Sequence, residues 1–207
     1  RYAEYMKTHD GDGDVNDIPN INTDDSFDRA YLIVGVTDPA VCAELLDALS
    51  SSGGKASFLF TEKQLSVSGD LLRRITVSGS AVVLSVDAAS GSTRTLSAIE
   101  RANRTLWTAC NAKTRLVVLT GASDETLRAV QEAGYCPVSI DLDYSTGLPS
   151  ASRAGSAIVS MARRGGCAAY LGADSAAQEI WDSLLSRLRG SNCPISQLIE
   201  LSARRGD

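Results

Sequence analysis

The side chains best suited to chemistry in this sequence are carboxylates and hydroxyls that follow runs of apolar residues. Each run is typical of a β-strand, so these polar residues come where successive strands end. They are Thr37, Asp38, Ser85, Asp87, Thr120, Asp141, Asp143 and Asp174. Carboxylate oxygens bind hard cations, so a cluster of these aspartates would suit Mg²⁺ or Ca²⁺. The candidates for contact with a ligand are Asp38, Asp87, Asp141 and Asp143. Capping a helix or facing water is the more ordinary role of an aspartate at such a position, and Asp38 followed by Pro39 predicts the start of a helix.

Histidine is nearly absent, and this limits the chemistry that the strand ends can support. His9 is the single histidine, and it lies in a polar stretch before the first apolar run. Ser-His-Asp hydrolysis, HExxH peptidase chemistry and most catalytic zinc sites need imidazole groups in the folded core. The sequence therefore excludes these mechanisms. No resident cofactor is expected, and the oxygen-bound divalent cation stays open as the alternative.

An acidic stretch over residues 8–28 differs from the rest of the chain. It is rich in Asp, Asn and Gly and has no apolar period. Three aspartates alternate at its start, but Val15 and Ile21 stand where an EF-hand loop needs Gly and Glu. A solvated linker is therefore favoured over a calcium site. We expect residues 1–29 to be an acidic N-terminal segment and residues 30–207 to form one folded domain. The sequence starts with Arg rather than Met, so we expect it to be a fragment of a longer chain.

The composition is that of a globular protein rather than a nucleic-acid binder or a membrane-spanning chain. The 207 residues are 43% hydrophobic and 22% charged, with a formal net charge of −5. Phosphate binding needs a basic face, so no nucleic-acid partner is expected. The apolar runs are far shorter than a membrane span. The two tryptophans, Trp107 and Trp181, are expected to pack in the core.

The cysteines carry little information. There are five, and no two have the CxxC spacing of metal or redox sites. We interpret them as small buried apolar residues. A disulfide such as Cys136–Cys167 remains open at this stage.

From Ala30 onward, strand patterns alternate with helix patterns. Strands are predicted over residues 31–36, 56–60, 81–86, 115–119, 136–142 and 167–171. Between them, apolar residues recur at helical spacing, and glycines such as Gly79 and Gly134 end the helices. This alternation predicts an α/β fold with a parallel sheet, whose sites belong at the carboxyl ends of the strands. Periodicity alone does not decide between an open sheet and a closed barrel.

Read in order, these segments resemble the polysaccharide deacetylase domain (NodB homology, carbohydrate esterase family four). That family has a strand ending in two aspartates, a helix ending in LLDAL, a lysine followed by a strand like KATFF, then DLLRRI and GHEIGLH. The matching segments are Leu45–Leu49, Lys55–Phe60, Asp70–Ile75 and Gly79–Leu84. The likeness covers about residues 30–200. It implies a distorted (β/α) barrel of the polysaccharide deacetylase type.

The resemblance also implies a site, which this sequence does not preserve. In the family, one aspartate and two histidines hold a divalent metal, and a second aspartate is the base. The base position falls on Thr37, the metal aspartate on Asp38, and the two histidines on Ser85 and Ala89. The family's R-x-P-x-G motif starts at Val117, and only its glycine, Gly121, is kept. The final strand, Cys167–Gly172, has no histidine. An aspartate alone cannot hold a tetrahedral zinc, so no catalytic residue and no metal site are expected.

The leading hypothesis is therefore a deacetylase-like pseudoenzyme. It would act as a module that binds polysaccharide, peptidoglycan or another protein, or as a structural module, at the bacterial cell surface. The extracellular location follows from the resemblance alone. A first alternative is a divergent carbohydrate N-deacetylase or hydrolase with an oxygen-only metal site at Asp38, Asp87 and Asp141. A second is an open-sheet α/β domain of unrelated role.

Overall fold

The structure, a computed structural model, describes residues 29–145, 147, 149–173 and 178–199. The acidic stretch 8–28 and Asp174 lie outside the described residues, so the linker and calcium interpretations stay predictions. The strands are β1 (Ala30–Val36), β2 (Ser57–Phe60), β3 (Ala81–Asp87), β4 (Leu116–Thr120), β5 (Cys136–Pro137), β6 (Leu142–Tyr144), β7 (Cys167–Ala173) and β8 (Ile195–Ser196). The helices are α2 (Pro39–Ser51), α3 (Glu62–Val67), α4 (Gly69–Ser78), α5 (Ser92–Cys110), α6 (Asp124–Glu132), α7 (Ala151–Ala162) and α8 (Gln178–Gly190).

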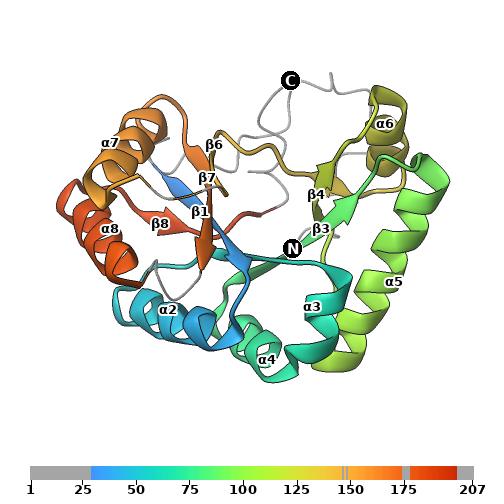
Figure 1. Ribbon diagram of the computed structural model, residues 1–207, viewed down its shortest axis with the longest axis horizontal. Coiled ribbons are helices and arrows are strands. Elements are labelled where there is room, and N and C mark those ends of the chain that lie inside the picture. The colour runs from blue at the N-terminus through green and yellow to red at the C-terminus, as the bar shows by residue number, and fades with distance from the viewer. Residues whose placement is uncertain (1–28, 146, 148, 174–177, 200–207) are drawn as a thin grey trace, which may run out of the picture.

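The strands form one curved sheet, in the order β5-β4-β3-β2-β1-β7-β6, with β8 paired to β1. Every pairing among the described strands is parallel, because helices or long loops carry the chain back between most of them. The helices lie outside the curve (Figure 1). The predicted α/β fold with a parallel sheet is confirmed.

The predicted strand 136–142 is wrong, because the chain breaks it into two. β5 pairs with β4 at one edge of the sheet, whereas β6 pairs with β7 at the other edge. Five residue steps join Pro137 to Leu142, and an extended chain of that length spans at most about 18 Å. The two edges therefore approach each other, and residues 138–141 cross the opening between them. The sheet is an incomplete barrel.

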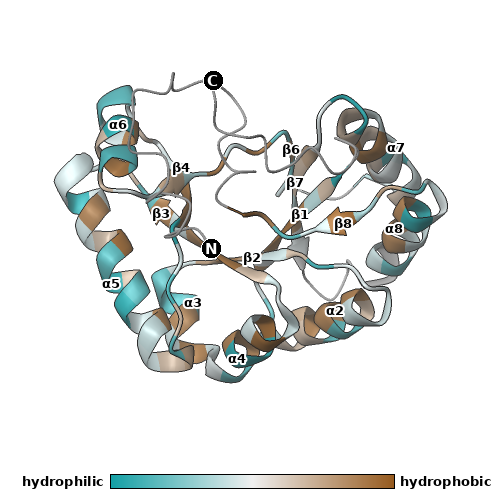
Figure 2. Cartoon of the chain, turned by 180° about the vertical axis from the view of Figure 1, so that it is seen from behind, coloured by the Kyte–Doolittle hydropathy of each residue, from teal (hydrophilic) through white to brown (hydrophobic). Residues whose placement is uncertain are grey.

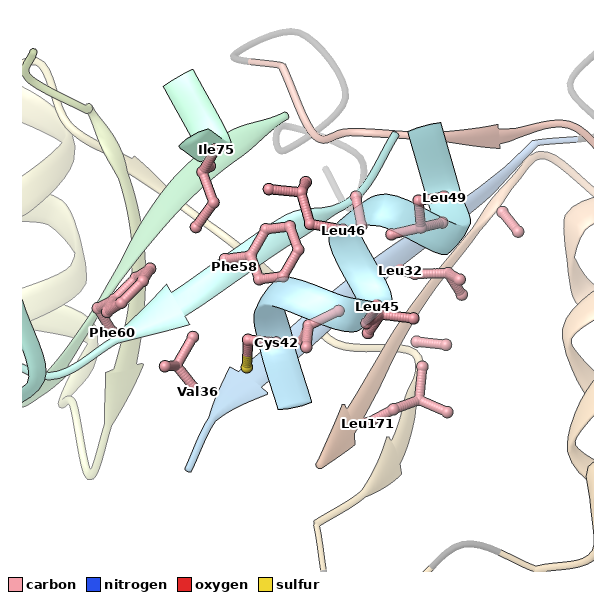
Figure 3. Close-up of a cluster of buried hydrophobic side chains, with 14 of the residues drawn as sticks. Leu32, Val36, Cys42, Leu45, Leu46, Leu49, Phe58, Phe60, Ile75 and Leu171 are labelled. Carbon is pink, nitrogen blue, oxygen red and sulfur yellow. The ribbon is translucent and has the colours of Figure 1, made fainter. Parts of the chain in front are cut away.

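Side chains alternate between the two faces of the sheet, as the period of a strand requires. On the helix side, Leu32, Val34 and Val36 join Phe58 and Phe60 in a large apolar cluster with α2, α4 and other helices (Figure 3). Figure 2 shows apolar residues along the strands and in bands on the helices. The inner face holds a second cluster, which consists of Ile33, Leu59, Val83, Leu116, Cys136, Val138, Ala168 and Leu198.

The chain after α8 covers the amino end of the barrel. Leu198 is buried in the inner cluster, and its backbone N–H donates to the Ser57 hydroxyl over 2.7 Å. Ser57 is also fully buried, so this hydrogen bond satisfies a backbone group that water does not reach. One end of the barrel is therefore covered, and the carboxyl ends of the strands form the other.

The predictions for the cysteines and the tryptophans are confirmed in part. All five cysteines are free, and four are buried while Cys110 is half-buried, so the Cys136–Cys167 disulfide is excluded. Cys136 and Cys167 lie in different apolar clusters on opposite faces of the sheet. Trp181 is buried as predicted, but Trp107 is 49% exposed, so the core prediction for it is wrong. No helix within the described ranges is long and apolar enough to cross a membrane.

Candidate functional site

The carboxyl ends of the strands form the mouth of the barrel, and strand parity decides which side chains face into it. Every second residue of a strand lies on the same face. Counting in twos toward the carboxyl end therefore gives the inner-face positions, starting from Ile33, Leu59, Val83, Leu116 and Ala168. The mouth residues on this face are Thr37, Thr61, Ser85, Asp87, Thr120, Asp143, Tyr170 and Gly172. Most of these side chains carry hydroxyl groups. The mouth is therefore rich in neutral groups that donate and accept hydrogen bonds.

Tyr170 occupies the interior just below the mouth. Its hydroxyl and ring lie so close to Gly35 that a Cβ at position 35 would overlap them. Burial raises the pKa of the Tyr170 phenol, and the nearby Asp143 carboxylate raises it further. The phenol therefore stays protonated and remains a hydrogen-bond donor at neutral pH. This role could not be predicted from the sequence, because the ring reaches Gly35 only through the register between β7 and β1.

Asp38 and Asp87 both lie at the carboxyl end, and both hold local backbone structure. The Asp38 carboxylate caps α2 by accepting from the Ala40 N–H over 2.8 Å, with Pro39 as the first helical residue. The Asp87 carboxylate accepts from the Ala89 N–H over 3.0 Å and so closes the turn after β3. The interpretation of Asp38 as a helix cap is confirmed.

Asp141 does not lie at the carboxyl ends, so its assignment to the mouth is wrong, whereas Asp143 lies close to the end of β6. The Asp141 carboxylate accepts from the Ala168 N–H over 2.7 Å, and Ala168 pairs with Tyr31 near the start of β1. Tyr31 precedes the end of β1 by five residues, which is about 16 Å at the rise of a strand. Asp143 is the second-last residue of β6 and pairs with the mouth residue Tyr170, and its carboxylate accepts from the Ser145 N–H over 2.8 Å. The structure therefore does not bring Asp38, Asp87 and Asp141 together.

A capping box at the end of β2 is a feature of the mouth that the sequence interpretation missed. The Thr61 hydroxyl accepts from the Gln64 N–H, while the Gln64 amide oxygen accepts from the Thr61 N–H over 2.7 Å. The same Gln64 amide donates to the carbonyl of Val36, which is the last residue of β1. The Thr-x-x-Gln spacing is the signal that reveals such a box. α3 is thereby fixed against the strand that leads to Thr37.

Comparison with solved structures gives several close matches in fold. A CE4 family pseudoenzyme from Bacillus anthracis matches with a TM-score of 0.70 and 16% identity, over 84% of this chain and 65% of that one. A mutant of the same pseudoenzyme, described as having restored enzymatic activity, also gives 0.70, at 15% identity over 84% and 67%. The family 4 carbohydrate esterase from Streptomyces lividans gives 0.70 at 17% identity, over 84% of this chain and 95% of that one. No protein-family profile and no curated protein matches the sequence.

This chain has the fold of the family 4 carbohydrate esterases. The polysaccharide deacetylase from Bacillus cereus shares it too, with a TM-score of 0.68 and 15% identity over 84% of this chain and 94% of that one. The resemblance inferred from the sequence and the distorted (β/α) barrel are thus confirmed, and the open sheet is excluded. The chain spans just under two thirds of the Bacillus anthracis pseudoenzyme.

The positions that the sequence resemblance assigns to the family's site can be placed on the structure. Thr37 and Asp38 follow β1, Ser85 is half-buried on the inner face of β3, and Ala89 is in the turn after β3. Ala89 lies against Gly121, where an added Cβ would come within 3.2 Å of the Ala89 methyl. These positions therefore lie together along one side of the mouth. Their side chains are two hydroxyls, one capping carboxylate and one methyl group.

The position given to the family's arginine does not reach this region. Val117 is fully buried in the cluster on the helix side, so a side chain there points away from the mouth. Val118 and Thr120 are the β4 residues on the inner face. On β7, Gly172 follows Leu171, at the place of the family's histidine, and no described atom lies within 4 Å of a Cβ built there.

The residues at these positions do not fit the transition metal of the deacetylase fold. Zinc in proteins takes thiolate, imidazole or carboxylate ligands, and three such ligands make a catalytic site. Within the described ranges, no three His, Cys, Asp or Glu side chains are grouped to hold a metal ion. Cys42 is close enough to Asp38 for the carboxylate to affect it, but burial and Asp38 together raise the pKa of its thiol to about 12. It therefore stays a neutral thiol.

Proposed function

We propose that the chain is a non-catalytic member of the deacetylase fold that binds glycan at the barrel mouth, at the bacterial cell surface. The observation that carries this proposal is the set of groups at the mouth. Hydroxyl side chains from β1, β3, β4 and β7 stand where metal-dependent hydrolysis needs imidazoles and a free carboxylate. Hydroxyls bind sugar hydroxyl groups as donors and acceptors, but near neutral pH they do not act as a general base.

The similar proteins support a glycan as the ligand. One of them is described as a polysaccharide deacetylase, and another as a pseudoenzyme of the same family. The mutant of that pseudoenzyme with restored enzymatic activity indicates that this fold can lose and regain chemistry by substitution. A protein ligand or a purely structural role is the competing outcome of the binding experiment.

The oxygen-only metal hydrolase is not favoured by the geometry. It needs Asp38, Asp87 and Asp141 around one cation, and Asp141 lies at the level of Tyr31, at the opposite end of the strands. Calcium binds oxygen ligands in a more flexible geometry than zinc allows. No single cation, however, can bind ligands that lie about 16 Å apart along a strand.

The experiment has a catalytic arm and a binding arm. We expect no acetate release from N-acetylated chitooligosaccharides or peptidoglycan, with or without added Zn²⁺. We expect chitooligosaccharide binding by calorimetry, weakened severalfold by Thr120→Val, which removes a mouth hydroxyl while keeping the side-chain shape. Thr108→Val makes the same change on the exposed surface of α5 and should leave binding unchanged. Zinc-dependent turnover, or binding that Thr120→Val leaves intact, would overturn the proposal.

A further inference from the structure

A groove of about 1060 Å³ lies at the end of the sheet opposite the mouth. Its lining comes mainly from the second half of α5, the turn after α6 and the residues that lead into β4 and β5. Its lining includes Glu100, Arg104, Trp107, Lys113 and Tyr135. The groove therefore belongs to the amino ends of the strands, and no step of the function proposed above uses it.

The exposed tryptophan in this groove is paired with a cation. The Lys113 ammonium lies 5.6 Å from the centre of the Trp107 ring, at the distance of a cation–π contact. That face of the ring is thus covered and cannot stack on a sugar. Asn103 also lines the groove, but its amide nitrogen donates to the Thr114 carbonyl over 3.0 Å and its oxygen accepts from the Thr114 N–H over 2.9 Å. Both features argue against a neutral glycan at this place.

The charge of the groove points to an acidic ligand. The lining includes three cations, Arg104, Lys113 and Arg115, and one carboxylate, Glu100, although the whole chain has a net charge of −5. Within the part of the chain that the structure describes, no carboxylate lies within 4.0 Å of the Arg104 or Lys113 side chain. A turn away on α5, Arg101 is paired with Glu62 over 2.7 Å. Cations beside an exposed tryptophan suit a peptide that carries carboxylates and apolar side chains.

We infer that this groove binds the acidic segment of the same chain, residues 8–28. The segment holds seven aspartates, no lysine or arginine, and the apolar side chains Ile18, Ile21 and Phe27. It joins the domain at Arg29, immediately before β1, and therefore at the same end of the parallel sheet as the groove. Three strand spacings and the register offset separate Ala30 from Leu116 by roughly 20 Å. About eight extended residues span that distance, so the segment is long enough.

Tryptophan fluorescence provides a direct test, because acrylamide is a neutral quencher that reports the exposure of Trp107. Trp181 is buried, and the variant Trp107→Phe measures its residual contribution. The segment is neutralised at Asp10, Asp12, Asp14 and Asp17 by Asp→Asn substitution. The matched control makes the same four-charge change on the exposed surface of the domain, at Asp47, Asp70, Asp124 and Asp182.

We expect the quenching constant of Trp107 to rise about twofold when the segment is neutralised, and to be unchanged in the control, because ion pairs hold the segment in place. Raising NaCl to 0.5 M should expose Trp107 in the unmodified chain to the same extent, since salt screens such pairs. Lys113→Glu should give a high quenching constant that neutralising the segment no longer changes.

Unchanged quenching in the neutralised segment, or an equal rise in the control, would overturn the inference. A rise that depends on protein concentration would also overturn it, because the groove would then hold the segment of a second copy. Failure of the mouth to bind glycan is a separate result and bears only on the proposed function.

Discussion

The contact between Tyr170 and Gly35 fixes the shape of the barrel interior, and Gly35→Ala tests it. A methyl group at position 35 would overlap the Tyr170 hydroxyl and the ring carbon that carries it. The ring is held by the inner apolar cluster, so it cannot withdraw without strain. Overpacking of this kind costs about 2 kcal/mol of unfolding free energy. Gly54→Ala is the matched control, because a Cβ there meets its neighbours at an ordinary 3.5 Å.

A double-mutant cycle with Tyr170→Phe separates this overlap from any general effect of the substitution. Tyr170→Phe removes the hydroxyl and alone should cost less than about 1 kcal/mol. In the phenylalanine background, Gly35→Ala should become less costly, with a coupling of about 1 kcal/mol or more. The assay is urea unfolding of the four variants. Additivity within about 0.5 kcal/mol would refute the placement of the ring over Gly35.

Three further predictions concern hydrogen bonds and titrating groups elsewhere in the fold. Ser57→Ala should cost about 2 kcal/mol in urea unfolding, because it leaves the buried Leu198 N–H without its acceptor; a cost near zero would contradict this. Asp38→Ala should cost about 1 kcal/mol and Asp38→Asn much less, because asparagine also caps a helix; equal losses would argue for a need for charge at this position. Burial and the nearby Asp38 raise the pKa of the Cys42 thiol from 9.0 to about 12. Burial, Asp141 and Cys193 raise the pKa of the Cys167 thiol from 9.0 to about 12 as well. The folded state therefore holds these protons more tightly, so their contribution is complete below pH 9 and is lost as the pH rises toward 12. The unfolding free energy should fall over that range, and less steeply in Cys42→Ala; an identical slope in the variant would show that this thiol does not contribute.

Local signals predicted most of the helices and strands, because caps and apolar spacing act within a few residues. Asp38-Pro39 and Gly79 marked helix ends that the structure contains. The short helix α3 was not predicted, because its six residues are too few to show a helical period. The single strand predicted over residues 136–142 is two strands in the structure. The break depends on where the chain leaves one edge of the sheet and joins the opposite edge, which local sequence does not reveal.

The candidate site was predicted less well, because it depends on register rather than on local sequence. Asp141 follows an apolar run as Asp87 does, yet that run leads from one sheet edge to the other, so Asp141 comes directly before β6 rather than at the end of a strand. Tyr170 is indistinguishable from any strand tyrosine until its neighbour on β1 is known. Trp107 has the helical spacing of a core residue, but it lines an open groove and is 49% exposed.

Zinc stoichiometry is the measurement that tests most directly whether the mouth has lost its metal chemistry. The chain is incubated with Zn²⁺, freed of unbound metal and measured by elemental analysis beside the variant Thr37→Asp/Ser85→His/Ala89→His, which restores the family's residues. We predict far less than one zinc per unmodified chain, unaffected by Asp38→Asn, and a gain in zinc by the restored variant. One zinc per unmodified chain, lost on Asp38→Asn, would contradict the account.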